Sequence, residues 1–290
     1  MNLRPVLIAL LLPALSGAAF AATKPFEARD LVTLDRVSSP TLSPDGRKLV
    51  VAVREADFEA NKASTGLWIE DLFARDAAPP VRFTAEGFNV NSPAFSPDGE
   101  SLEFSVRAAG REEAWSTNFD LYQGDVRART APRNLTAGNL AMDTGPEFSA
   151  DGKTLYYRAM KRPGFEADRL ALMAMDLGSG KTREIAPDWD RSADGIKLSA
   201  DGKAIYTQAY DVGTHPLFKV DIASGQATKV LAGGTIGGFD LVGDTLAYTR
   251  DNLKSPAQAF VARADGSAER QVTRANADVL PNLAFGDYEQ

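Results

Sequence analysis

The chain has 290 residues, with 32 Lys and Arg against 39 Asp and Glu, a single His and no Cys. The absence of cysteine excludes a disulfide framework, a Cys-ligated zinc site and a thiol nucleophile, and one histidine excludes a His-rich metal site. A net charge of −7 without a basic block argues against a nucleic-acid partner, and no motif predicts a cofactor or a metal ion.

The first 22 residues form a predicted secretory signal peptide. Arg4 precedes an apolar run from Val6 to Leu15, and Ala19-Phe20-Ala21 supplies the small-x-small pattern of a signal-peptidase site. We expect cleavage near Ala21 or Ala22 and a periplasmic or secreted protein. An N-terminal membrane anchor is the alternative, but this run is too short to span a bilayer comfortably. After cleavage we expect no membrane contact.

A short helix is expected over residues 27–36, and a repeated octet organises the chain after it. The octets span Ser39–Gly46, Ser92–Gly99, Gly145–Gly152 and Gly195–Gly202, with a degenerate copy at Gly238–Gly243. In a tight turn, Pro presets φ at the second position, Asp fits the third, and Gly adopts the positive φ that leads into the next strand. The predicted structural turn residues are therefore Asp45, Gly46, Asp98, Gly99, Asp151, Gly152, Asp201 and Gly202.

One short strand precedes each octet turn and three follow it. Four antiparallel strands in a unit of about 50 residues is the plan of a β-propeller blade. We predict an all-β propeller of about five four-stranded blades within residues 23–276. The blades are expected at about 37–84, 90–136, 143–186, 193–231 and 236–273. A β-sandwich is the alternative, and four in-register copies of the octet disfavour it.

Connections in such a meander alternate between the two ends of the strands. The octet turns occupy one end. The other end carries the links between blades and long, irregular loops over residues 54–66, 107–119, 160–169, 210–216 and 250–258. Because binding and catalysis commonly use loops on a rigid scaffold, we expect the functional surface at this second end.

Two clusters at that end are candidates for substrate recognition. They comprise Arg111, Glu112, Glu113 and Trp115, and Asp188, Trp189, Asp190 and Arg191. Paired carboxylates beside an arginine and an aromatic ring could bind a cationic group such as a peptide amine, or could form a solvated loop. In the second cluster, Trp189 could instead pack between the third and fourth blades. His215, next to Pro216, is expected at the surface.

The sequence predicts no catalytic residue. No serine lies in a Gly-x-Ser-x-Gly elbow, no phosphate-binding Gly-rich loop is present, and the strand–helix alternation of an α/β catalytic domain is missing.

The octet Ser-Pro-x-Phe-Ser-Pro-Asp-Gly resembles the WD40-like (PD40) propeller repeats of the prolyl oligopeptidase (S9) family and of TolB-like periplasmic proteins. Four further segments resemble the entry, interior and exit of propellers in bacterial S9 peptidases of the dipeptidyl or acylaminoacyl type. They are residues 30–40, 115–122, 160–169, and 271–277 followed by 286–290.

That resemblance implies a propeller that filters peptide substrates for a C-terminal α/β-hydrolase domain. The family's catalytic Ser, Asp and His cannot be placed on any residue here, and residues 277–290 are expected to form a linker toward the missing domain. Family propellers usually have seven blades, and the stretch between the first two repeats looks like a join where blades could be missing. By this resemblance Arg111, Glu112, Glu113 and the link over residues 188–191 face the hydrolase.

A different class of function is a free-standing, TolB-like periplasmic propeller that binds a protein partner on its long-loop face. A truncated gene product without present function is a third possibility.

Overall fold

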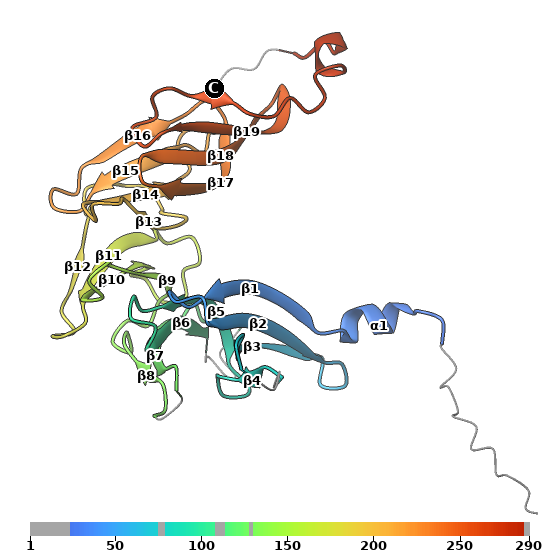
Figure 1. Cartoon of the computed structure of the whole chain (residues 1–290), viewed down its shortest axis with the longest axis vertical. Coiled ribbons are helices and arrows are strands. Elements are labelled where there is room, and N and C mark those ends of the chain that lie inside the picture. The colour runs from blue at the N-terminus through green and yellow to red at the C-terminus, as the bar shows by residue number, and fades with distance from the viewer. Residues whose placement is uncertain (1–23, 75–78, 108–113, 128–129, 287–290) are drawn as a thin grey trace, which may run out of the picture.

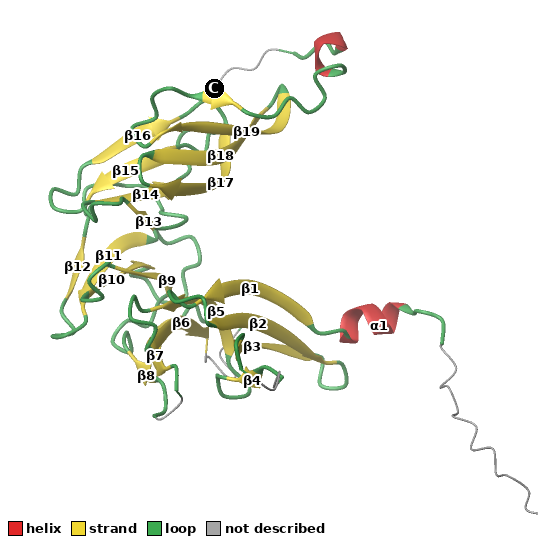
Figure 2. Cartoon of the chain, in the orientation of Figure 1, coloured by secondary structure: helices red, strands yellow, loops and turns green. Residues whose placement is uncertain are grey.

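The computed structural model describes residues 24–74, 79–107, 114–127 and 130–286. These residues fold into short antiparallel strands with very little helix, which confirms the predicted all-β fold (Figure 2). Five four-stranded blades lie side by side in an open arc, with blade 1 at one end and blade 5 at the other (Figure 1). The signal peptide and Arg111, Glu112 and Glu113 lie outside the described residues.

Each blade is a meander whose strands are numbered in chain order. Blade 1 contains β1 (Arg36–Leu42), β2 (Lys48–Asp57), β3 (Lys62–Asp71) and β4 (Val81–Arg82). Blade 2 contains β5 (Asn89–Phe95), β6 (Ser101–Arg107), β7 (Asp120–Asp125) and β8 (Arg133–Asn134). Blade 3 contains β9 (Asp143–Phe148), β10 (Thr154–Ala159), β11 (Ala171–Asp176) and β12 (Thr182–Glu184). Blade 4 contains β13 (Lys197–Leu198), β14 (Ala204–Gln208), β15 (Leu217–Asp221) and β16 (Ala227–Leu231). Blade 5 contains β17 (Thr235–Val242), β18 (Thr245–Asn252), β19 (Ser255–Arg263) and β20 (Arg270–Gln271).

The N-terminal helix is shorter than expected. Helix α1 covers only Ala28–Thr33, because Leu34 is already extended with ψ of 133°. The Asp30 carboxylate accepts the N–H of Glu27 at 2.9 Å and fixes the start of the helix. Arg29 lies over the Phe58 ring, 4.3 Å from its centroid, and attaches the helix to the tip of the β2–β3 hairpin. A single 3₁₀ turn, η2 (Leu280–Asn282), follows blade 5.

Two of the five expected long loops are instead hairpins. Strands β2 and β3 stay paired out to Asp57 and Lys62, and β18 and β19 out to Asn252 and Ser255. The polar ends of these strands lack the apolar alternation that marks a half-buried strand, since they extend into solvent beyond the blade. The prediction of irregular loops over residues 54–66 and 250–258 was therefore wrong, whereas blades 2, 3 and 4 do carry longer loops.

The cores lie between consecutive blades, which pack face to face. Buried apolar side chains of β2 and β3 meet those of β6, so blades 1 and 2 are in direct contact across the join where blades were suspected to be missing. Equivalent clusters fill the other three interfaces. The gap in the arc lies between blades 5 and 1 (Figure 1).

The octet turns share a hydrogen-bond network in which serine is as important as aspartate. The four serines are Ser43, Ser96, Ser149 and Ser199. Each Oγ donates to the Asp two residues later at 2.6–2.7 Å and accepts the N–H five residues later at 2.9 Å. Each Asp also accepts the N–H two residues beyond it at 3.0–3.1 Å. In all four octets the pKa of the aspartate is lowered, and the main cause is the hydrogen bond that it accepts from the serine hydroxyl.

The closing glycines adopt the left-handed conformation that the turn requires, with φ between 67° and 71°. A further repeated contact involves a threonine two residues beyond the end of a fourth strand. The hydroxyls of Thr84, Thr136 and Thr273 accept the N–H of Leu67, Leu121 and Ala259 at 2.9–3.0 Å.

Candidate functional site

Consecutive blades are joined at the end opposite the octet turns. A residue within or shortly before a third strand forms a parallel bridge with a residue that begins or just precedes the first strand of the next blade, at Thr65–Asn89, Phe119–Met142 and His215–Thr235. Between blades 3 and 4 the N–H of Ala193 donates to the carbonyl of Leu170 at 3.0 Å. We call this end the long-loop face. It carries the links between blades, the β2–β3 and β18–β19 hairpins, residues 114–119 of the blade 2 loop, and the loops over residues 160–170 and 209–216.

Every blade exposes a large apolar side chain on this face. They are Phe58 (47% exposed), Trp115 (69%), Phe165 (42%), Tyr210 (72%) and Leu253 (72%), and the link between blades 2 and 3 adds Leu140 (63%). Isolated exposed apolar residues are normal, but one on each blade of the same face is typical of a surface that contacts another protein or domain.

The link between blades 3 and 4 holds the second predicted cluster. Asp188 and Asp190 are exposed, and Asp190 pairs with its neighbour Arg191 at 2.5 Å. Arg191 also reaches Asp211 in the blade 4 loop at 2.8 Å, and Lys229 pairs with Asp211 at 2.5 Å. These two cations lower the pKa of the Asp211 carboxyl, with Lys229 the larger cause.

Trp189 lies against Phe218 of β15, with ring centroids 5.3 Å apart, and it borders the core between blades 3 and 4. It occupies the packing position that was the alternative to a recognition role. Trp115 lies on the blade 2 loop. Among the described residues no hydrogen bond, ion pair or ring contact joins it to the 188–191 link. The structure therefore does not bring the two predicted clusters together in its described part.

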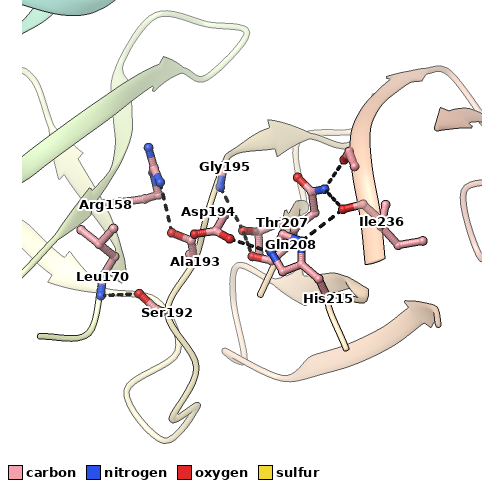
Figure 3. Close-up of polar contacts among 11 residues, drawn as sticks. Arg158, Leu170, Ser192, Ala193, Asp194, Gly195, Thr207, Gln208, His215 and Ile236 are labelled. Carbon is pink, nitrogen blue, oxygen red and sulfur yellow. Dashed lines mark hydrogen bonds and ion pairs between the residues drawn. The ribbon is translucent and has the colours of Figure 1, made fainter. Parts of the chain in front are cut away.

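The single histidine is buried, so the expectation of a surface position was wrong. Figure 3 shows its polar contacts. Nε2 of His215 lies 2.6 Å from Oδ2 of Asp194, and Nδ1 lies 3.1 Å from the carbonyl oxygen of Ile236. Each ring nitrogen therefore lies within hydrogen-bond distance of an oxygen atom. The Tyr210 ring covers the imidazole with 4.4 Å between centroids.

His215 therefore connects three segments: the link before blade 4, the blade 4 loop and the first strand of blade 5. Gln208 supports the same joint, since its Nε2 donates to the carbonyl of Ile236 at 2.6 Å. The position next to Pro216 suggested exposure, and no local pattern in the sequence shows that β17 would cover the ring. The geometry is that of a structural joint between blades.

Buried carboxyl groups lie between blades 2 and 3. Glu103 on β6 is fully buried, and burial raises its pKa to about 8 although Gln123 Nε2 donates to Oε1 at 2.7 Å. Burial likewise raises the pKa of Asp143 to about 7. Asp143 lies at the wall of a 410 Å³ cavity whose apolar lining includes Met173 and Met175. Both acids hold a proton over much of the range in which exposed carboxyls are ionised.

No group of three or more potential ligands in the described part of the chain could hold a metal ion. Likewise, none of the described helices is long and apolar enough to cross a membrane.

Comparison with known proteins finds relatives in sequence and in fold. No protein-family model matches the chain. A dipeptidyl-peptidase 5 of Porphyromonas gingivalis is 28% identical over 191 residues, which cover 65% of this chain and 28% of that protein. The chain is a propeller related to those of the S9 peptidases. It spans little more than a quarter of the length of that relative.

Solved structures agree on the fold. A puromycin-hydrolysing peptidase of Mycobacterium tuberculosis superposes with a TM-score of 0.65 and 16% identity, over 82% of this chain and 38% of the peptidase. A TolB of Agrobacterium tumefaciens gives a TM-score of 0.61 with 19% identity, over 82% of this propeller and 80% of that chain. At these identities the likeness shows the β-propeller fold alone.

Proposed function

We propose that this S9-related propeller is the substrate-gating part of an exported serine peptidase that acts on peptides. In this hypothesis the long-loop face lies against an α/β-hydrolase domain and limits the size of the peptides that enter. The observation that carries the proposal is the apolar residue exposed by each of the five blades on that one face. The relatedness to a dipeptidyl-peptidase 5, of which the chain spans 28%, supplies the class of partner domain.

The joints described above suit such a role. Loops that gate a substrate must be held at fixed distances from one another. Ion pairs from Asp211 to Arg191 and Lys229 hold the blade 4 loop, and Gly164 N–H donates to Thr117 Oγ1 at 3.0 Å to join the loops of blades 2 and 3. In this hypothesis Trp115, Asp188 and the 111–113 segment contact the hydrolase or its peptide.

One observation favours a second candidate, a free-standing propeller that binds a protein partner. The fold is that of the Agrobacterium TolB as well as that of the peptidase. The same apolar face would then receive a separate protein.

Detection of the native protein separates the two candidates and tests export. Cells are fractionated and probed with an antibody raised against blade 3. The peptidase hypothesis expects a periplasmic or secreted band well above the mass of 290 residues, with an N-terminus directly after Ala21 or Ala22. A periplasmic band at the mass of the propeller alone would favour the TolB-like alternative, and a cytoplasmic band with an intact N-terminus would contradict export.

Activity measurements test the gating role directly. The purified chain is expected to show no hydrolysis of dipeptidyl anilides, and measurable activity would refute the non-catalytic interpretation. In the larger native protein, Phe165→Ser and Tyr210→Ser together should reduce discrimination between short and long peptides, as judged by kcat/KM. Val242→Ser is the matched control, because Val242 is 74% exposed at the octet-turn end. An equal effect of the control would exclude a specific role for the long-loop face.

A further inference from the structure

The 410 Å³ cavity between blades 2 and 3 has an apolar interior and an open side. Met160, Met173 and Met175 line it, and each of them is buried or half-buried. Gly138 and Thr182 also line it and are exposed, so the cavity opens to solvent beside β12, the edge strand of blade 3. Its volume lies within the range of about 300–1,000 Å³ that is usual for sites of small organic ligands.

The repeat explains why this joint holds a cavity. Three residues before the end of the third strand, four of the blades carry an aromatic side chain, and these are Trp68, Tyr122, Phe218 and Phe260. Blade 3 carries Met173 there instead. At two joints the link between blades adds a second ring, since Phe88 lies 6.5 Å from Tyr122 and Trp189 lies 5.3 Å from Phe218. The joint between blades 2 and 3 lacks a ring at both of these places.

Asn139 stands where the next joint has Trp189. Each of the two donates its backbone N–H to the carbonyl three residues earlier, at 2.9 and 3.1 Å, so they occupy the same place in equivalent turns. The Trp189 ring extends over Phe218, whereas the shorter Asn139 bonds within its own joint. Its Nδ2 donates to Asp143 Oδ1 at 3.1 Å and to the carbonyl of Met160 at 3.0 Å. The space that an indole fills at one joint is therefore open at the other.

Lys161 provides a positive charge at the opening. Its side chain lines the cavity, is 68% exposed, and pairs through Nζ with Glu184 Oε2 at 2.7 Å. Arg169 pairs with the same carboxylate, so a ligand can take the ammonium group without leaving Glu184 unpaired. At the inner wall, burial raises the pKa of Asp143 to about 7 and keeps this carboxyl largely neutral at about pH 6. The cavity thus offers a largely neutral interior and an ammonium group at its opening.

We propose that this cavity binds a small aromatic carboxylate, with the ring beside Met173 and the carboxylate at Lys161. The ring takes the place that Trp189 occupies at the next joint. Apolar cavities of folded proteins bind aromatic molecules, and thioether sulfurs make favourable contacts with aromatic rings. The flexible methionine side chains adjust to the shape of the ring. This inference does not rest on the proposed function.

Titration calorimetry of the purified protein at about pH 6 tests the class of ligand. The probes are indole-3-propionate and tryptamine, which share a ring and carry opposite charges. We expect one indole-3-propionate to bind per chain, and tryptamine to bind about fivefold more weakly, the size of effect of an exposed ion pair. Lys161→Met should remove this preference and keep the site for the ring. No saturable binding, equal binding of the two probes, or a preference that survives in Lys161→Met would overturn the proposal.

Variants that fill the cavity test its place. Asn139→Trp puts the chain's own indole into the space and should weaken binding of indole-3-propionate at least tenfold. Because this variant also loses the hydrogen bonds of Asn139, Thr182→Trp provides a second test, with an exposed residue that covers the opening. Thr228→Trp is the matched control, since Thr228 is exposed on the edge strand β16 of blade 4. Wild-type affinity in a filling variant that is folded by circular dichroism, or an equal loss in the control, would refute the site.

Discussion

Glu103 predicts how the stability of the propeller depends on pH. Its side chain is fully buried between blades 2 and 3. Ser101 Oγ and Gln123 Nε2 donate to Oε1 at 3.2 and 2.7 Å, and Oε2 has no hydrogen-bond partner. Burial raises its pKa from 4.5 to about 8. Between these pH values the native protein holds a proton that the unfolded chain has released, so the free energy of unfolding must fall as pH rises.

The size of the effect follows from the two pKa values. The free energy of unfolding falls with a slope that approaches about 1.4 kcal/mol per pH unit. Raising the pH from 5.5 to 7.5 should therefore lower it by about 2.5 kcal/mol through Glu103 alone. Glu103→Gln cannot ionise and should remove that part of the pH dependence. At pH 5.5 the variant should match the wild type within about 1 kcal/mol, since both side chains are neutral and each leaves its donor group, an O–H in protonated Glu and an NH2 in Gln, without a partner.

Urea unfolding followed by circular dichroism at several pH values between 5.5 and 7.5 provides the assay. For an m-value of about 2–3 kcal/mol/M, the midpoint of the variant should gain on the order of 1 M over the wild type by pH 7.5. Glu100→Gln is the control, because Glu100 is exposed on the octet turn of the same blade. Parallel curves for Glu103→Gln and the wild type would show that Glu103 is ionised and stabilised in the native protein, against the reasoning above.

Three further predictions concern single contacts. Ser149→Ala should destabilise blade 3 by about 1 kcal/mol in urea unfolding, because two turn hydrogen bonds are lost; an unchanged midpoint would contradict the serine network. Gly225→Ala should lower the free energy of unfolding by at least about 2 kcal/mol more than Gly46→Ala does. Both glycines have φ near 70°, but only an added Cβ at Gly225 would lie 2.4 Å from a backbone carbonyl oxygen. Equal losses of stability would exclude this steric cause. His215→Ala should speed amide hydrogen exchange at Ile236 by tenfold or more, whereas unchanged exchange would mean that the joint does not depend on the imidazole.

The repeated octet made the fold predictable, because its Asp and Gly report a turn whose chemistry is local. The same octet contains Ser149 and its equivalents, whose role was missed. The only sign of this hydrogen bond in the sequence is that a serine recurs at the same position of each octet.

The burial of His215 could not be predicted from its neighbours in the sequence. The ring is buried by contacts with Asp194 and Ile236, which are each 21 residues away in the chain. The exposure of Val37 was equally hidden, because its sequence context matches that of the buried Val90. Placement in the arc, rather than local sequence, decides which of the two valines is covered.

The open arc also has a consequence for folding. In a closed ring the first and last blades must find each other before the structure is complete, which adds a loop-closure cost. In the part of the chain that the structure describes, the extensive contacts between blades join sequence neighbours, so these five blades should behave as a linear array with nearest-neighbour coupling. Unfolding would then begin at the two ends and move inward, with the slowest amide exchange in blades 2 to 4.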